Sequence, residues 1–488
     1  MTQRDAFKFT AFDFNSGLQY WLLAGITLLA LILRLYKLGE WSFWIDEIFT
    51  VNRAQIHYST LEDVSRNIPP AGLWLPLSLL ATSGTFTIFG VSEWSARLVP
   101  SLIGVLSIPI LYSPTKKLFG PGVALIAALL LGVSPWHLYW SQNARFYTAL
   151  LLFYALASFA FFYGIERDRP AYLALFAGLF YLAASERLLA ALLGPVVLGY
   201  LILVWLLPFE KPAGFRLRNL LLLAAPGLAF GLFELYSIVR TGSSTLLYVF
   251  DVFAGQSIDS PLRLLIVIFF NIGIPVVSLA FFSGIYLVWQ KSRIGLLLFL
   301  SAVVPPLVLA AINPYVFIVD RYAFMVLPFW IILGAVGVVE LFRATGEHRM
   351  LLAAGVLALL LVDAAGNHLL YYQINHGNRP DWRSAFYFIE ERKSDGDVIV
   401  SAVENIGDYY LAEDIMPLAD IDPIAIRDGT QRYWFVIDSE NGWWSGAQKQ
   451  WVETNSSLVE AWYLRTRENM HIRVYFYDPA NPSTARNP

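Results

Sequence analysis

Residues 18–36 read LQYWLLAGITLLALILRLY, and residues 121–140 read PGVALIAALLLGVSPWHLYW. Each stretch is a run of about 20 predominantly apolar residues, the length that an α-helix needs to cross the hydrocarbon core of a bilayer. Arg34 is the only formally charged residue in the two stretches. The two runs therefore predict membrane-spanning helices and not the core helices of a soluble protein.

Further runs of this kind follow along most of the chain. We place about eleven spans of bilayer-crossing length near residues 18–36, 98–113, 121–140, 146–164, 170–185, 188–207, 219–239, 263–289, 294–312, 323–342 and 350–370. The many Thr, Ser and Gly residues of 71–92 favour a helix that lies along the interface instead. The expected fold is mainly α, a polytopic transmembrane helical bundle with interfacial helices in a long first outer loop, 39–95.

The composition agrees with a membrane protein. Of the 488 residues, 57% are hydrophobic and only 15% are charged, too few to cover the surface of a soluble chain this long. The net charge of -3 offers no basic surface for nucleic acid. The chain has no cysteine, which excludes disulfides, thiolate catalysis, and cysteine-ligated zinc or iron–sulfur clusters.

The orientation follows from the basic residues. Residues 1–17 are polar and lack an apolar stretch before a cleavage site, so we expect a cytoplasmic tail and not a signal peptide. An inside N-terminus puts most basic loop residues on the cytoplasmic side, as the positive-inside rule requires. These residues are Lys116, Lys117, Arg167, Arg169, Lys211, Arg216, Arg218, Lys291, Arg293, Arg343 and Arg349. The sequence thus predicts a multi-pass protein of the inner (plasma) membrane.

The composition changes after residue 370. We expect a transmembrane catalytic domain over 1–370 and a small α/β extracytoplasmic domain over 371–488. In the second domain, 382–394 has a helical pattern, and three stretches rich in β-branched and aromatic residues predict strands. The three expected strands are 397–402, 433–438 and 472–478.

The segment WSFWIDEIFT, residues 41–50, places Asp46 and Glu47 among aromatic and aliphatic side chains just beyond the first span. A solvated loop pair is the simplest interpretation, but these neighbours argue against free solvation. A carboxylate that loses hydration becomes a stronger base, and acids kept at membrane depth are costly. We therefore predict Asp46 and Glu47 as catalytic residues, and as candidate oxygen ligands of a divalent cation such as Mg²⁺ or Mn²⁺.

The segment SQNARFY, residues 141–147, follows the third expected span and places Arg145 on the same membrane face as Asp46. An arginine there can extend to lipid head groups. Alternatively, its fork of donors clamps a phosphate group. The acid expected on the same face favours the phosphate clamp, with Asn143 and Tyr147 as supporting residues.

The segment VDRYAFMVLP, residues 319–328, opens the tenth expected span on the outer side. A structural Asp–Arg pair at a helix start is one interpretation, because an acid suits the positive end of the helix dipole. The other interpretation makes Arg321 and Tyr322 ligands of the donor phosphate. Glu186, in the outer turn between the fifth and sixth spans, is a weaker supporting candidate.

Several absent or weak motifs narrow the function. There is no G-x-x-x-x-G-K-[ST] and no H-E-x-x-H, so neither an ATP-driven pump nor a zinc protease is expected. The acidic triplets 395–397 and 420–422 imitate a metal–nucleotide signature, but such triplets arise often by chance. The prolines of NIPPAGLW, 67–74, stiffen the first outer loop. The tryptophan pair 443–444 fits packing of the outer domain better than sugar stacking.

In this order and spacing, WIDEIFT, NIPPAGLW, FGVSEWSARLVPSLIG, SQNARFY and DRYAFMVLP resemble the polytopic GT-C glycosyltransferases. The nearest resemblance is to bacterial relatives of protein mannosyltransferases and of the lipid A aminoarabinose transferase, over roughly residues 18–345. The resemblance implies a polyprenyl-phosphate-linked sugar as donor and Asp46 as the residue that activates the acceptor. Such relatives often carry an acid where this chain has Asn143, and Glu186 is a candidate replacement.

The resulting prediction is a polyprenyl-phosphate-sugar-dependent glycosyltransferase that acts with inversion on an acceptor hydroxyl at the outer membrane face. Asp46 would be the base, and Arg145 and Arg321 would stabilise the departing phosphate. The expected partners are the lipid-linked donor, a lipid, glycan or protein acceptor, and membrane lipids, but no nucleic acid. Two alternatives stay open: a transporter or flippase of a lipid-linked sugar, and a non-catalytic subunit. The paired halves common in transporters are not visible.

Overall fold

The computed structural model describes residues 16–56, 60, 63, 75–241, 260–343, 347–439, 445–464 and 470–480. The chain divides into two compact units. The first draws on Met1–Tyr36, Ile56–Ile88 and Arg97–Ala365, and the second on Lys37–Gln55, Phe89–Ala96 and Gly366–Pro488. The segment 67–74 and the tryptophan pair 443–444 lie outside the described residues.

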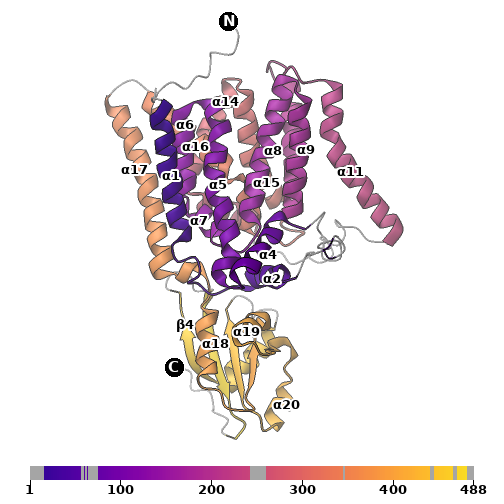
Figure 1. Cartoon of the computed structure of the whole chain (residues 1–488), viewed down its shortest axis with the longest axis vertical. Helices are drawn as coiled ribbons and strands as arrows, with labels where there is room; N and C mark the ends of the chain where they lie inside the picture. The colour runs from indigo at the N-terminus through magenta and orange to yellow at the C-terminus, as the bar shows by residue number, and fades with distance from the viewer. Residues whose placement is uncertain are drawn as a thin grey trace. The chain divides into compact units, whose positions relative to one another are not determined.

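The first unit is a bundle of helices, many of which run side by side (Figure 1). Its helices, including three (α4, α5 and α17) with one end in the second unit, are α1 (Ser16–Leu35), α4 (Leu77–Phe89), α5 (Glu93–Phe119), α6 (Pro121–Val133), α7 (Pro135–Ser141), α8 (Tyr147–Arg167), α9 (Pro170–Glu186), η1 (Leu188–Leu192), α10 (Leu193–Leu206), α11 (Leu217–Thr241), α13 (Pro261–Ile272), α14 (Ile274–Trp289), α15 (Arg293–Ile312), η2 (Asp320–Val326), α16 (Leu327–Arg343) and α17 (Glu347–Leu369).

By length and composition, seven helices of the described chain can cross a membrane, or up to ten if each of three bent pairs is one span. The expected mainly helical, multi-pass fold is confirmed. The expected span at 170–185 is the shorter helix α9, of 17 residues. Within 71–92 lies α4, whose 13 residues are too few to cross the hydrocarbon core.

Two elements form the centre of the bundle. Within the stretch Asp320–Arg343, which combines η2 and α16, 89% of the most apolar window is buried inside the protein, and the value for α8 is 83%. For α1 it is 17%. A helix that is apolar all round but mostly uncovered by protein is suited to contact with lipid. The elements η2–α16 and α8 therefore form the buried core of the first unit.

Two of the expected spans are not straight helices but pairs of helices with a bend between them. The α6–α7 pair bends by 58° at Ser134 and Pro135, and the α13–α14 pair bends by 98°. Gly273 lies between α13 and α14 with φ +103, a backbone conformation that favours glycine. The expected span at 263–289 is thus a bent pair of helices, either one broken span or a re-entrant pair.

A buried arginine fastens α1 to the bend between α6 and α7. The Arg34 guanidinium is fully buried and donates to the carbonyl oxygens of Ala30 (3.0 Å) and Gly132 (2.9 Å). Its Nη2 lies 2.6 Å from His137 Nδ1, which must accept because guanidinium can only donate. His137 is therefore neutral, with its proton on Nε2. A charged residue in a span that faces the bundle interior and is fully hydrogen-bonded fits the rule for membrane proteins.

Three of the loops expected on the cytoplasmic face lie together in the first unit. Arg293 forms a two-pronged ion pair with Glu166, at 2.6 and 2.7 Å. Asp168 pairs with Arg216 at 2.8 Å and with Arg218 at 2.9 Å. The loops after α8, after α10 and before α15 thus share one end of the bundle, as one membrane face requires.

The second unit contains a five-stranded mixed sheet in the order β2-β1-β3-β5-β4 (Figure 1). Strand β1 pairs in parallel with β2 and β3, and β5 pairs antiparallel with β3 and β4. The three expected strands and the expected helix are confirmed, whereas β2 and β4 were not expected. The elements are α2 (Ile45–Ala54), α18 (Trp382–Glu390), β1 (Val398–Ser401), α19 (Glu404–Leu411), β2 (Met416–Pro417), η5 (Leu418–Asp420), α20 (Pro423–Asp428), β3 (Tyr433–Asp438), α21 (Gly446–Asn455), β4 (Ser457–Trp462) and β5 (Ile472–Tyr477).

The absence of cysteine makes the orientation directly testable. Exposed positions Ser260 and Ser439, replaced singly by cysteine, should react with a membrane-impermeant thiol reagent added to intact cells. Cysteines at the exposed positions Lys117 and Gln290 should react only after permeabilisation. Labelling of Lys117→Cys from outside would reverse the orientation of the helical core.

Candidate functional site

The acidic pair lies at the start of a short helix of the second unit. Helix α2 begins at Ile45, with Trp44 as its extended N-cap residue, so Asp46 and Glu47 occupy the first turn. Acids are favoured there because the helix dipole is positive at its N-terminus. Asp46 is half-buried, whereas Glu47 is completely buried. The two expected catalytic acids therefore have different environments, although they are neighbours in the chain.

Glu47 is paired with an arginine that sequence reasoning did not single out. Arg379 Nε lies 3.4 Å from Glu47 Oε2, and both side chains are almost entirely buried. A buried carboxylate is tolerated only when a positive charge or several donors compensate it. Glu47 is therefore compensated within the fold, and Asp46 is the more accessible acid of the pair.

The SQNARFY turn connects α7 to α8 in the first unit. Gln142 is fully buried and its amide donates to the carbonyl oxygens of Arg34 (2.9 Å) and Tyr36 (2.8 Å), at the C-terminal end of α1. It satisfies carbonyl groups that a helix end leaves without partners. Asn143 is also completely buried, whereas Arg145 is half-buried. Among the polar residues of this turn, Arg145 is thus the one best able to meet a ligand.

Phe324 joins this turn to the DRYAF segment. Its ring lies 5.2 Å from Trp136, 6.3 Å from Trp140 and 6.4 Å from Tyr147, measured between centroids. Tyr147 in turn packs on Trp140 at 4.2 Å. The segments SQNARFY and DRYAF, about which the sequence says only that both are on the outer side, are thus brought together by an aromatic cluster.

Arg321 and Tyr322 lie in η2, next to this cluster, and both are half-buried. The preceding residue, Asp320, accepts a 2.6 Å hydrogen bond from the Asn271 amide at the end of α13. This contact fixes the start of η2 against the 98° bend of the α13–α14 pair. Arg321 and Tyr322 are therefore carried by a segment that is held on two sides.

A second arginine lies close to Arg145. The guanidinium carbon of Arg145 is 5.1 Å from the centre of the Phe146 ring, and that of Arg187 is 5.6 Å from the same ring. The two guanidinium groups are thus no farther apart than the sum of these distances. Within the described chain no acid lies in ion-pair range of Arg187. The sequence did contain a signal, because Arg187 directly follows Glu186 in the outer turn.

Glu186 forms the contact between α9 and α4. Its Oε1 accepts from the Ser78 backbone amide at 3.0 Å, and its Oε2 accepts from the Ser78 hydroxyl at 2.5 Å. Ser78 is in the first turn of α4, so the carboxylate caps that helix. Both oxygens of this buried side chain have donors. Glu186 therefore anchors the part of the first outer loop that precedes α5.

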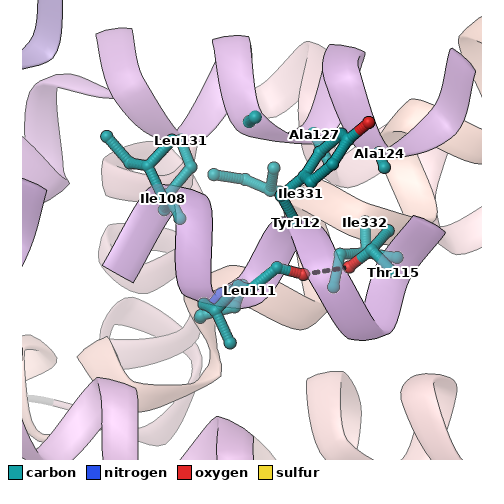
Figure 2. A pocket seen from close by; sticks show the side chains of 11 residues that line it. Ile108, Leu111, Tyr112, Thr115, Ala124, Ala127, Leu131, Ile331 and Ile332 are labelled. Carbon is teal, nitrogen blue, oxygen red and sulfur yellow. Dashed lines mark hydrogen bonds between the residues drawn. The ribbon is translucent and has the colours of Figure 1, made fainter. Parts of the chain in front are cut away.

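A small apolar pocket lies within the first unit, and none of these groups lines it. Side chains of α5, α6 and α16 line it, including Ile108, Leu131 and Ile331 (Figure 2). Its polar atoms are the hydroxyls of Tyr112 and Thr115, and the latter donates to the Leu111 carbonyl at 2.7 Å. The pocket contains none of the candidate site residues and has few partners for a sugar.

The metal expectation has weak geometric support. Within the described residues, no group of three or more His, Asp or Glu side chains could hold an ion. Glu47 faces Arg379, so a cation at the acidic pair would have to compete with a guanidinium group. This donor set does not fit a resident metal, and no catalytic step is assigned to one.

The acidic triplets of the second unit have structural roles. Asp397 lies 2.7 Å from Arg432 and accepts a 3.0 Å hydrogen bond from the Trp434 indole. Although burial acts in the opposite direction, the hydrogen bonds from Ser394, Trp434 and Arg432 hold the pKa of Asp397 below its ordinary value. Asp422 caps α20 by accepting from the Ile424 amide.

The chain is similar to known proteins in both sequence and fold. The family described as dolichyl-phosphate-mannose-protein mannosyltransferase matches residues 69–229. The putative mannosyltransferase YycA of Bacillus subtilis is 30% identical over 166 residues, which are 34% of this chain and 23% of that relative. The match thus spans less than a quarter of the curated relative.

Solved structures extend the similarity to nearly the whole chain. Apo ArnT from Cupriavidus metallidurans has a TM-score of 0.61 at 14% identity, covering 96% of this chain and 100% of that one. The same protein bound to undecaprenyl phosphate gives 0.59. The Archaeoglobus fulgidus oligosaccharyltransferase gives 0.58 at 13% identity, covering 91% and 73%, and has also been solved with a tethered acceptor peptide and with Zn and sulfate. The resemblance to polytopic GT-C glycosyltransferases is confirmed.

The role of Glu186 gives the first test of this site. Glu186→Gln removes the negative charge from the cap on α4 and replaces the oxygen that accepts from the Ser78 hydroxyl with an amide donor. We expect a loss of about 1–3 kcal/mol in stability, seen as a lower Tm in detergent. Ser78→Ala should add little further loss in the Glu186→Gln background, because the two residues share one interaction. A normal Tm combined with complete loss of turnover would instead make Glu186 a catalytic acid.

Proposed function

We propose that this protein transfers a sugar from a polyprenyl-phosphate carrier to an acceptor hydroxyl at the outer face of the cytoplasmic membrane. The whole-chain fold similarity to ArnT, which has also been solved bound to undecaprenyl phosphate, is the observation that carries the proposal. A membrane-embedded donor also explains why so few polar groups are gathered within so much apolar protein. In this proposal residues 1–370 form the catalytic membrane domain, and 371–488 form a domain outside the membrane.

Asp46 acts as the base in this proposal. Its carboxylate removes the proton of the acceptor hydroxyl, and the acceptor oxygen attacks the anomeric carbon from the side opposite the phosphate. The bond between that carbon and the phosphate oxygen breaks, and its electron pair leaves with the polyprenyl phosphate. The configuration is thereby inverted. Asp46 suits this task better than Glu47, because Asp46 is half-buried whereas Glu47 is fully buried beside Arg379.

The departing phosphate needs positive charge. Arg145 and Arg321, with the Tyr322 hydroxyl, supply it in this proposal, and Asn143 and Tyr147 are supporting residues in the Arg145 segment. The fork of an arginine matches two phosphate oxygens at once. Arg187 joins this group because it shares the Phe146 ring with Arg145 and has no acid in ion-pair range in the described chain. Stabilisation of the charge that develops as the bond breaks lowers the barrier directly.

A flippase or transporter of the same lipid is the second candidate. It would use the arginines to bind the phosphate, and the bends of the α6–α7 and α13–α14 pairs favour it, since transporters commonly use broken helices. It would make no covalent change. The two functions therefore differ in one measurable product, free polyprenyl phosphate.

Free polyprenyl phosphate can be measured directly. Purified protein in detergent should release polyprenyl phosphate from a polyprenyl-phosphate-linked sugar when a panel of lipid, glycan and peptide acceptors is supplied. Asp46→Asn keeps the shape and removes the base, so release should fall by at least about 100-fold with a nearly unchanged Tm. Because the donor set does not fit a resident metal, we expect EDTA to leave release unchanged in the same assay.

The outcomes separate the candidates. Binding of the lipid without release across the panel would favour the flippase. Asp46→Asn protein that keeps a tenth or more of wild-type turnover, about 1.4 kcal/mol in barrier, would remove Asp46 from the role of base.

The second prediction concerns the phosphate ligands. Arg145→Ala and Arg321→Ala should each weaken donor binding by about tenfold or more, the loss of a charge-assisted hydrogen bond. Arg145→Lys should recover only part, because lysine lacks the planar fork. Arg187→Ala should weaken binding in the same direction. Titration with fluorescent polyprenyl phosphate measures all four variants, and unchanged affinity in both Arg145→Ala and Arg321→Ala would remove the clamp.

A further inference from the structure

A short segment of the C-terminal part is bound to the acidic loop at several points. Residues 376–383 read HGNRPDWR, and the loop residues 39–47 read GEWSFWIDE. Both belong to the second unit, although more than 300 residues separate them in the chain. We call residues 39–47 the acidic loop.

The first contact is made by Trp41. Its indole lies 5.1 Å from the His376 ring and 6.4 Å from the Tyr371 ring, between centroids. Gly377 has φ +61, and a Cβ built there would overlap the Trp41 indole. Glycine is therefore required at 377 for two reasons, the backbone conformation and the close approach of the indole.

The second contact is polar and next to the first. The Ser42 hydroxyl donates to the Pro380 carbonyl at 2.7 Å, and Ser42 is buried. Arg383 donates to the carbonyl oxygens of Glu40 at 3.2 Å and Gly39 at 3.4 Å. Without Arg383, the carbonyl groups of Gly39 and Glu40 would need water as a partner.

Arg383 also closes a small network with Tyr410. It is paired with Glu93, to which the Tyr410 hydroxyl donates at 2.8 Å, and that hydroxyl accepts from the Phe43 amide at 2.8 Å. Burial, together with the nearby charge of Glu93, raises the pKa of Tyr410 well above its ordinary value. The hydroxyl therefore keeps its proton at physiological pH and can donate to Glu93 while it accepts from Phe43.

The third contact is the ion pair of Arg379 with Glu47. Arg379 is itself oriented by hydrogen bonds to the Gly377 carbonyl (3.0 Å) and the Tyr371 hydroxyl (3.3 Å). Its Nε faces Glu47 Oε2 at 3.4 Å. The buried charges of Arg379 and Glu47 compensate each other, so breaking this ion pair is expected to destabilise the fold.

We infer that Arg379 is a positioning residue: by holding Glu47 it fixes the turn of α2 that presents Asp46 to the acceptor. The inference rests on the proposed function of Asp46. Asp46 and Glu47 are consecutive residues of the first helical turn, so a rotation of the turn that releases Glu47 also displaces the Asp46 carboxylate. Catalysis is sensitive to displacements of about 1 Å, which can reduce rates by about 100-fold.

The test compares Arg379→Gln with a matched control in the same unit. Arg432→Gln also removes an arginine from an ion pair with an acid, Asp397, but it does not contact the acidic loop. Arg379→Gln should lower kcat for polyprenyl phosphate release by about tenfold or more with the donor KM unchanged within about twofold, as expected for lost orientation. Arg432→Gln should lower Tm and leave kcat unchanged. Arg379→Lys should restore part of kcat.

A double variant separates positioning from a general loss of folding. Glu47→Gln in the Arg379→Gln background removes the buried charge that has lost its arginine, so Tm should recover while kcat stays low. Recovery of both Tm and kcat would show that the pair is merely structural and overturn the inference. A kcat of Arg379→Gln equal to that of the wild type would overturn it as well.

A readout without turnover keeps this inference distinct from the proposed function. In the naturally cysteine-free chain, Asp46→Cys gives a single thiol, whose rate of alkylation reports the setting of the turn. We expect the rate to change about threefold or more when Arg379→Gln is added, a modest population shift, and to be unaffected by Arg432→Gln. An unchanged rate would overturn the positioning role even if no donor is found. Wild-type protein that turns over no donor, with a changed rate, would instead count against the proposed function alone.

Discussion

A backbone amide or carbonyl group inside a bilayer has no water to bond with, and each such group must find a partner in the protein. Unbroken helices meet this requirement by themselves, but every bend or helix end leaves groups to be satisfied. The first unit satisfies them with buried side chains: Gln142 at the end of α1, Ser134 at the α6–α7 bend, and Arg34 at the Gly132 carbonyl beside that bend. These three polar side chains of an apolar unit thus bond to the backbone.

The same constraint explains where the candidate ligands of the phosphate lie. Arg145 is in the break between α7 and α8, Arg187 follows the end of α9, and Arg321 is in the 3-10 turn before α16. A charged side chain needs an aqueous or polar surrounding, and the ends of helices provide polar groups that the middle of a span lacks. Phe324, packed on Trp140, and Phe146, shared by Arg145 and Arg187, bring these separate ends into one region of the first unit.

The sequence predicted the features that depend on local pattern. The spans follow from the length of apolar runs, and the strands β1, β3 and β5 follow from dense β-branched and aromatic residues. Features that depend on distant partners were not predictable. The two-residue strand β2 exists only because β1 is beside it, and no period or motif connects Glu47 with Arg379, 332 positions later. The 98° bend at Gly273 was predictable in part, because Gly273 and Pro275 mark its position in the sequence but do not give its angle.

The helical conformation of α2 gives the consecutive acids Asp46 and Glu47 different surroundings. If these residues were in an extended strand, the two carboxylates would point to opposite faces, and in a flexible loop they would be interchangeable. In the first turn of α2 they are instead rotated by about 100° from each other around the helix axis. One direction leads to Arg379 and complete burial, and the other leaves Asp46 half-buried. The ion pair with Arg379 thus determines that Glu47 is the buried acid and that Asp46 is the accessible one.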